Sequence, residues 1–402
     1  MKKITITLLC VLLAIGLAAC SSTTAASPSA EASQAASAEA VATPSPDASA
    51  EAAASSATET QAAESAGAGE ILSTGPHGET ATSATELSLT DEEINKLKSG
   101  GYTVALSFHY AGNDWSTAQQ KGLQDTFDKL GIKVISVTDA DFKPEQQISD
   151  IENALTMNPD AIVSIPVDPV SSASAFKKAV DAGVKLVFMD NCPDGLTAGK
   201  DYTAVVSADN WGNGVKSAEI MGEQLGGKGK IAMVYYDANF FVTNQRDQAF
   251  RETIQTKFPD IEIIEEAGFD DENKGAEVGD ALLAKHPDLN GIYASWDIPA
   301  EGIASAAIAA GRTDLVVTTI DLGNNVAKII AENGIVKGLG AQLPYDQGVA
   351  EATLVGYALL GKDAPQYVAV PALKVTHDNI LDAYKNVYHT DAPQEIQDAY
   401  VK

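Results

Sequence analysis

The chain has 402 residues and a formal net charge of −28, with 27 basic against 55 acidic residues. Binding to nucleic acid or to an anionic lipid surface depends on clustered Lys and Arg, so this composition argues against both as charge-driven functions. Hydrophobic residues make up 45% of the chain, which is enough for a core that needs no disulfide bond or structural metal.

The first twenty residues are typical of a secretory signal. Two lysines precede an apolar run over residues 4–19, which ends in small residues just before Cys20. This run is shorter than the roughly 20 residues that a membrane-spanning helix needs. Its end resembles the lipobox of bacterial lipoproteins. We therefore expect a signal peptide over residues 1–19, lipidation of Cys20 and anchoring on the extracytoplasmic face of the cell membrane, with Cys192 left as a free thiol.

Residues 20–88 are dominated by Ala, Ser, Thr, Glu and Pro. Such a segment buries too little apolar area to offset its ordering entropy, so we expect a disordered tether after the lipidated cysteine. A short helix over residues 87–99 is expected to lead into the folded part.

From Gly101 onward, short apolar runs alternate with helical patterns of 10–15 residues, which is typical of βαβ units and parallel sheets. The expected strands are residues 102–107, 133–137, 161–165, 185–189, 231–235, 261–265, 291–294, 315–319 and 367–375. The expected helices are residues 116–130, 144–157, 171–182, 242–257, 274–285, 299–310 and 345–360. Two sets of about four βα units are too large for one small core, so two α/β lobes are predicted.

Polar and aromatic residues stand where several of these strands end. Asp190, Asp321 and two of the three tryptophans, Trp115 and Trp296, occupy such positions. A single Asp after a strand is more often a helix N-cap. Here, however, several strands from both lobes end in such residues, and these strand ends would face one cleft. Indole rings stack on the C–H faces of a sugar, and carboxylates accept strong hydrogen bonds from its hydroxyl groups. The pattern indicates a carbohydrate site.

Residues 101–391 resemble the periplasmic binding proteins of sugar ABC transporters, in the ribose-binding-like (type I) group. Asn113-Asp114-Trp115 resembles that family's Asn-Pro-Phe segment. The other similar segments are Met189-Asp190-Asn191, residues 207–210, residues 243–250, residues 294–297, Ile320-Asp321 and residues 341–344.

The resemblance implies an α/β fold with two Rossmann-like lobes, parallel sheets and a three-segment hinge. The chain would cross between lobes near Asp209, Gln342 and Tyr367. The first lobe would comprise residues 89–208 with 342–366, and the second lobe residues 209–341 with 367–402.

The resemblance also implies a set of ligand-binding residues: Asn113, Trp115, Asp190, Asn191, Phe241, Asn244, Arg246, Trp296, Asp321 and Gln342. Asn191 and Asn244 replace family arginines, and Trp296 replaces an asparagine. The loss of two arginines argues against an anionic ligand, so we expect a small neutral sugar or polyol. Core packing remains the alternative for Phe240 and Phe241. His109 is either a hydrogen-bonding or pocket-lining residue or a catalytic one, and Trp211 either packs between the lobes or lines the cleft.

We expect a monomeric solute-binding lipoprotein of an ABC importer that delivers its ligand to a membrane permease. Neither a cofactor nor a metal is expected, since no zinc or calcium spacing is present. One alternative is a sugar sensor that feeds a chemoreceptor or histidine kinase. Another is a glycoside-processing enzyme with Asp190 and Asp321 as an acid/base pair.

Overall fold

The computed structural model describes residues 70–401. The expected signal peptide, Cys20 and the tether up to residue 69 lie outside the described residues. Within the described part, no helix combines the length and the apolar character needed to cross a membrane.

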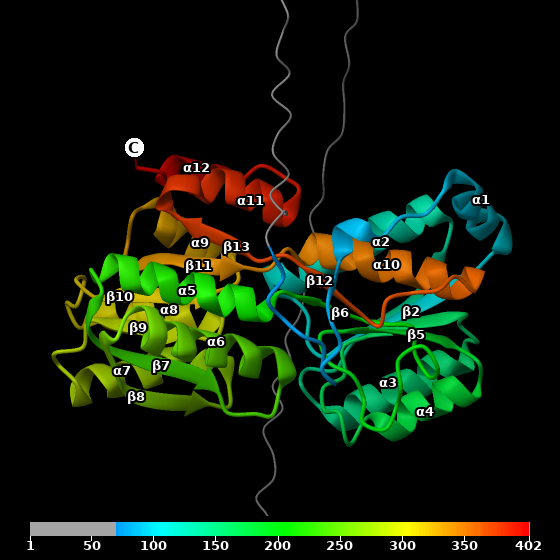
Figure 1. Ribbon diagram of the computed structural model, residues 1–402, viewed down its shortest axis with the longest axis horizontal. Helices are drawn as coiled ribbons and strands as arrows, with labels where there is room; N and C mark the ends of the chain where they lie inside the picture. Colours follow the sequence, from blue (N-terminus) through cyan, green and yellow to red (C-terminus); the bar gives the residue numbers. More distant parts are fainter. Residues whose placement is uncertain (1–69, 402) are drawn as a thin grey trace, which may run out of the picture. The chain divides into compact units, whose positions relative to one another are not determined.

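Residues 70–401 form two sheets, and the first has the strand order β1-β12-β6-β5-β4-β2-β3 with all neighbours parallel. Its strands are β1 (Thr82–Ser83), β2 (Thr103–Phe108), β3 (Lys133–Asp139), β4 (Ala161–Ser164), β5 (Lys185–Met189), β6 (Val205–Ala208) and β12 (Tyr367–Val370). One face packs against α2 (Asp114–Leu130) and α10 (Pro344–Leu360), beside which lies α1 (Asp91–Gly100). The other packs against α3 (Pro144–Thr156) and α4 (Ala173–Asp181), as Figure 1 shows.

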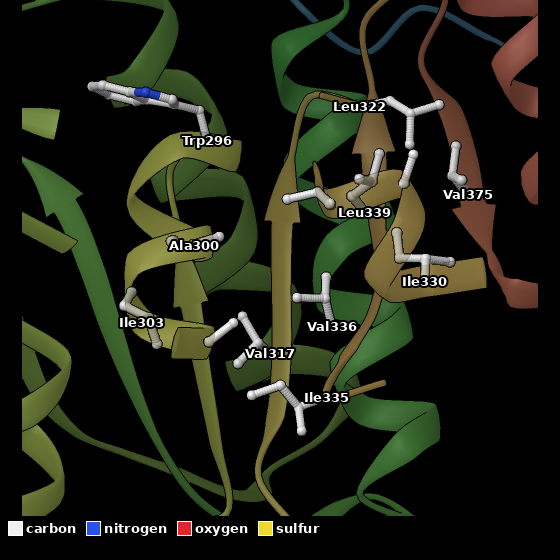
Figure 2. Close-up of a cluster of buried hydrophobic side chains, with 14 of the residues drawn as sticks. Trp296, Ala300, Ile303, Val317, Leu322, Ile330, Ile335, Val336, Leu339 and Val375 are labelled. Carbon is white, nitrogen blue, oxygen red and sulfur yellow. The ribbon is translucent and has the colours of Figure 1, made fainter. Parts of the chain in front are cut away.

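The second sheet has the order β13-β11-β10-β9-β7-β8, and all pairs are parallel except β11 with β13. Its strands are β7 (Lys228–Tyr236), β8 (Asp260–Phe269), β9 (Gly291–Ala294), β10 (Val316–Ile320), β11 (Val336–Ala341) and β13 (Leu373–Thr376). Helices α5 (Asn210–Gln224) and α6 (Phe241–Lys257) cover one face. The other face packs against α7 (Gly275–Lys285), α8 (Asp297–Ala309), α9 (Asn324–Ala331), α11 (Ile380–Tyr388) and α12 (Gln394–Ala399). Figure 2 shows this core, where Ile303 of α8 and Ile330 of α9 flank Val317 and Leu339.

Each sheet with its helices is called a lobe below, and the chain passes between the lobes three times. It crosses from β6 to α5, from β11 to α10 and from β12 to β13. The third crossing comes after Val370, because the single strand expected over residues 367–375 is two strands in different sheets. Pro371 separates them, and proline cannot donate a ladder hydrogen bond. Tyr367 itself pairs with β6 in the first sheet.

The expectation of a disordered tether up to residue 88 is wrong for its last part. Ser73 is buried, and its backbone N and Oγ both donate to Asp209 Oδ1 at 2.9 Å. Strand β1 then pairs with β12 in the first sheet. Composition misled here because a few specific contacts order the segment: the hydrogen bonds of Ser73, and the packing of Ile71 and Leu87 against the cores of the first sheet. The lead-in helix exists as α1, which Thr90 and Glu93 start with a capping box.

The sequence pattern did not predict β6, α5, α9, β11, α11 and α12. Two of these elements, α5 and β11, are rich in glycine. A Cβ on Gly214 would lie 2.2 Å from the carbonyl oxygen of Arg246, and one on Gly340 would lie 2.3 Å from that of Asn213. Helix α5 therefore packs directly against α6 and β11. The same glycines weaken the helical and strand signals by which these elements would be found.

Candidate ligand-binding site

A pocket lies between the two lobes, at the carboxyl ends of strands from both sheets. Its empty volume is about 460 Å³, part of which is open to solvent. Ligands of open parallel sheets bind at this edge. The lining residues are His109, Tyr110, Trp115, Phe142, Asp190, Tyr236, Phe240, Val242, Thr243, Arg246, Trp296, Asp321 and Gln342.

Asp190 reaches the pocket directly after β5. Its backbone is left-handed, with φ of 54°, a conformation that L-residues adopt at a cost but that Asp and Asn tolerate best. Ser207 Oγ donates to its Oδ1 at 2.7 Å. Burial raises the pKa of Asp190 to about 6, against the opposing effects of Ser207 and Arg246. The first lobe thus presents a desolvated carboxyl group held by one hydroxyl.

Asp321 is its counterpart after β10 in the second lobe. It too is left-handed, with φ of 68°, and its Oδ1 accepts from Gln342 Nε2 at 2.8 Å. Burial raises the pKa of Asp321, while Arg246 and Gln342 oppose the rise. The two lobes therefore offer matching acidic groups on matching strained turns.

Arg246 is the cation of the pocket. Its Nη1 donates to the carbonyl oxygen of Ser295 at 3.0 Å, and Nη2 donates to Asn210 Oδ1 at 2.8 Å. Nη1 also lies 3.5 Å from Asp321 Oδ2. Since one guanidinium faces two carboxyl groups, the polar end of the pocket carries no surplus positive charge. This balance disfavours an anionic ligand.

Aromatic rings line the remaining walls. In the first lobe, Tyr110 stacks on Phe142 with ring centroids 4.5 Å apart and is nearly parallel to Trp115 at 6.4 Å. In the second lobe, Trp296 meets Tyr236 edge-on at 5.3 Å. Such surfaces suit the C–H faces of a saccharide or polyol, which pack on π-systems while their hydroxyl groups turn to polar neighbours.

Two aromatic residues meet across the cleft. His109 of the first lobe and Phe240 of the second are stacked, with centroids 5.6 Å apart. Burial lowers the pKa of His109 to about 3, so the imidazole is neutral at physiological pH and acts as a further aromatic surface.

Six of the ten residues predicted from the sequence line this pocket: Trp115, Asp190, Arg246, Trp296, Asp321 and Gln342. The other four do not line it. Asn113 caps α2 through Ser116 N and donates to the hydroxyl of Tyr110. Asn191 is buried and donates to the carbonyl oxygen of Pro166. Asn244 is exposed and pairs with Asn239. Between the two neighbouring phenylalanines, Phe240 lines the pocket and Phe241 does not.

The sequence interpretation missed Tyr110, Phe142, Tyr236, Val242 and Thr243, and left His109 undecided. Three of these follow or end a strand: Tyr110 comes two residues after β2, Phe142 three after β3, and Tyr236 closes β7. The rule that identified Asp190, applied to aromatic as well as acidic residues, would have found them. Trp211 lies outside the pocket, where its backbone N donates to Ser73 Oγ at 2.9 Å.

Among residues 70–401, no cluster of three or more His, Cys, Asp and Glu side chains is arranged to hold a metal ion. The acidic groups of the pocket face an arginine and amide donors instead.

Residues 104–363 match the family described as "Periplasmic binding protein domain". The ribose import binding protein of Bacillus subtilis is 27% identical over 271 residues, which cover 67% of this chain and 86% of that protein. A sugar-binding protein of an ABC transporter from Bacillus halodurans is 26% identical with a TM-score of 0.62, covering 69% of this chain and 98% of that one.

A further solved structure is similar in fold. It is an ABC-transporter solute-binding protein from Agrobacterium vitis with α-D-tagatopyranose bound, at 24% identity and a TM-score of 0.66, covering 71% of this chain and 99% of that one. These findings confirm the predicted two-lobed α/β fold. They also set aside the glycoside-processing enzyme, because this family binds solutes for transport and does not catalyse reactions. The chain belongs to the periplasmic binding protein family.

Proposed function

We propose that this protein binds a small neutral sugar or polyol in the inter-lobe pocket and delivers it to the permease of an ABC importer. The observation that carries the proposal is the pairing of Asp190 and Asp321, from opposite lobes, between aromatic walls from both lobes. The relatives named above include a ribose import protein and a tagatopyranose complex, which supports a monosaccharide-sized ligand.

The lobes would act by hinge closure. A ligand stabilises a closed form only by contacts that the open form lacks, and this pocket draws polar groups from both lobes. We propose hinge segments near Asp209, near Gln342 and between Val370 and Leu373, where the chain crosses between the sheets. Lipidation of Cys20, anchoring on the extracytoplasmic face and a monomeric state complete the proposal.

The test is a thermal-shift screen followed by calorimetry. A ligand that prefers the native form raises the melting temperature. The panel contains pentoses and hexoses, including D-ribose and D-tagatose, together with polyols, deoxysugars, one uronic acid and one amino sugar. We expect saturable 1:1 binding of a neutral compound. Preferential binding of the uronic acid or the amino sugar would contradict the neutral-ligand proposal, and turnover of a glycoside would contradict the binding role.

Delivery to a permease has a separate test. Uptake of the identified radiolabelled compound by intact cells should be lost when the gene is deleted and restored by the wild-type chain. A chain with Cys20→Ala should restore it poorly. Normal uptake in the deletion strain, combined with loss of the transcriptional response to the same compound, would favour the sensor function instead.

A further inference from the structure

Asp114 and Asn324 form a contact between the lobes that involves no residue of the pocket. Asp114 is the first residue of α2 in the first lobe, and Asn324 is the first residue of α9 in the second. The backbone N of Asn324 donates to Asp114 Oδ2 at 2.8 Å, and its side-chain Nδ2 donates to Asp114 Oδ1 at 2.9 Å. Both carboxylate oxygens of Asp114 are therefore used by a single residue 210 positions away.

Helix α9 has no cap of its own. Gly323 precedes it and offers no side-chain acceptor, although the first N–H groups of a helix need acceptors from outside the helix. A side-chain oxygen that accepts from these groups stabilises a helix, and a negative charge there also complements the helix dipole. Asp114 supplies both features from the opposite lobe.

The two partners are held ready for this contact by their own lobes. The hydroxyl of Tyr384 donates to Asn324 Oδ1 at 2.8 Å, which directs the Asn324 amide nitrogen toward Asp114. In the first lobe, Asn113 caps α2, so the carboxylate of Asp114 is not needed by its own helix. The segment Asn113-Asp114-Trp115 resembles Asn-Pro-Phe of the family, and a proline at the middle position would provide no carboxylate.

We propose that Asp114 is a positioning residue for ligand binding, which caps α9 only when the lobes close and so sets the affinity for ligand without touching it. The inference rests on the proposed hinge closure. When only part of the population is competent to hold ligand, the apparent dissociation constant is the intrinsic one divided by that fraction. A contact found only in the closed form raises the fraction of molecules that are competent to bind, and it does so by the same factor for every ligand.

The surroundings of Asp114 explain why the contact must be a good one. This carboxylate also lies near Asp297 and Glu301. Burial raises the pKa of both groups, and the negative charge of Asp114 adds to the rise. The repulsion opposes closure, and the two hydrogen bonds from Asn324 offset it. The balance makes the closed form accessible without making it permanent.

The first test uses the affinity for the compound that the carbohydrate screen identifies. Asp114→Ala should weaken binding by about three- to tenfold, which is the effect expected from the loss of one helix cap. The weaker binding should result from faster dissociation of the ligand. Asn324→Ala should have a smaller effect, since the backbone N–H remains, and the double variant should bind no worse than Asp114→Ala alone. Asp128→Ala, which removes the same charge from the exposed end of α2, is the matched control.

The second test needs no ligand, because the proposal has the free protein close for part of the time, and it separates this proposal from the proposed function. Hydrogen exchange followed by mass spectrometry should show faster exchange in Asp114→Ala than in Asp128→Ala, both at the start of α9 and over residues 237–246 of the second lobe. A failed carbohydrate screen would count against the proposed function and leave this comparison intact. Identical exchange in the two variants, or strictly additive affinity losses for the 114 and 324 substitutions, would overturn the role of Asp114. If Asp114→Ala unfolds, Asn324→Ala gives the same comparison with α2 untouched.

Discussion

Arg246 and Asp321 form an ion pair in the pocket, with Nη1 and Oδ2 3.5 Å apart and both side chains buried. Arg246 is further fixed by Ser295 and Asn210, and Asp321 by Gln342. The pair is therefore built into the second lobe before any ligand arrives. Its preorganisation lowers the cost of ordering these polar groups on binding.

Asp321→Ala should destabilise the ligand-free protein as well as abolish binding. Removing one partner of a buried ion pair leaves an uncompensated charge, which costs roughly 3–5 kcal/mol. Urea denaturation should show a loss in the free energy of unfolding of about this size, whereas Asp363→Ala, at an exposed position, should show almost none. A loss below about 1 kcal/mol would mean that Asp190 takes over the role of counter-ion.

Trp115→Ala should weaken carbohydrate binding by roughly 1–3 kcal/mol, by analogy with other aromatic stacking platforms. Trp115→Phe should recover most of this loss because it restores an aromatic face. Titration followed by intrinsic fluorescence suits the measurement, because two of the three tryptophans, Trp115 and Trp296, line the pocket. Trp211→Phe is the control. Equal affinities for the wild type and Trp115→Ala would remove this indole from the ligand contact.

The sequence predicted best where one signal sufficed. Strands such as β4 and β5 are continuous apolar runs because both faces of the sheet are covered, and Asp190 and Asp321 stand out as polar residues directly after such runs. The prediction was poorer where a residue's role depends on packing. Gly340 looks unfavourable for a strand until the close approach of Asn213 is known. Asn191 and Asn244 occupy positions similar to those of family arginines, yet shorter side chains leave them bonded to Pro166 and Asn239, away from the pocket.

Asp190→Asn should flatten the dependence of stability on pH. The folded-state pKa of Asp190 is about 6 against an ordinary value of 3.8, so the native state binds the proton more tightly than the unfolded chain. This group therefore contributes most stability below about pH 4, and that contribution is lost as the pH rises through about 6. Asn cannot titrate and tolerates the left-handed backbone.

Urea denaturation between pH 4 and pH 7 tests this expectation. The free energy of unfolding of Asp190→Asn relative to the wild type should rise across this range by roughly 1–3 kcal/mol. Ser207→Ala should change the dependence in the opposite direction, since the Ser207 hydroxyl favours the ionised form. A constant difference between Asp190→Asn and the wild type would show that Asp190 titrates alike in the folded and unfolded states.

Ser73→Ala should weaken the attachment of the segment around Ser73 to Asp209, which lies where the chain crosses from β6 to α5. Asp209 Oδ1 accepts from Ser73 N, from Ser73 Oγ and from Gly212 N, and Ser73 Oγ accepts in turn from Trp211 N. The alanine variant keeps the first and third of these bonds and leaves the half-buried N–H of Trp211 without its acceptor. An unsatisfied buried donor costs roughly 1–3 kcal/mol, and because this N–H is only half-buried we expect a loss of about 1 kcal/mol. The control is Ser99→Ala, because the Ser99 hydroxyl bonds only within α1 at the surface. This substitution should change stability by no more than about 0.5 kcal/mol.

Limited proteolysis gives an independent readout, because a detached segment should be cut between residues 70 and 88 sooner than in the wild type. Equal stability and equal cleavage rates for the two serine variants would show that the hydrogen bonds of Ser73 hold nothing in place.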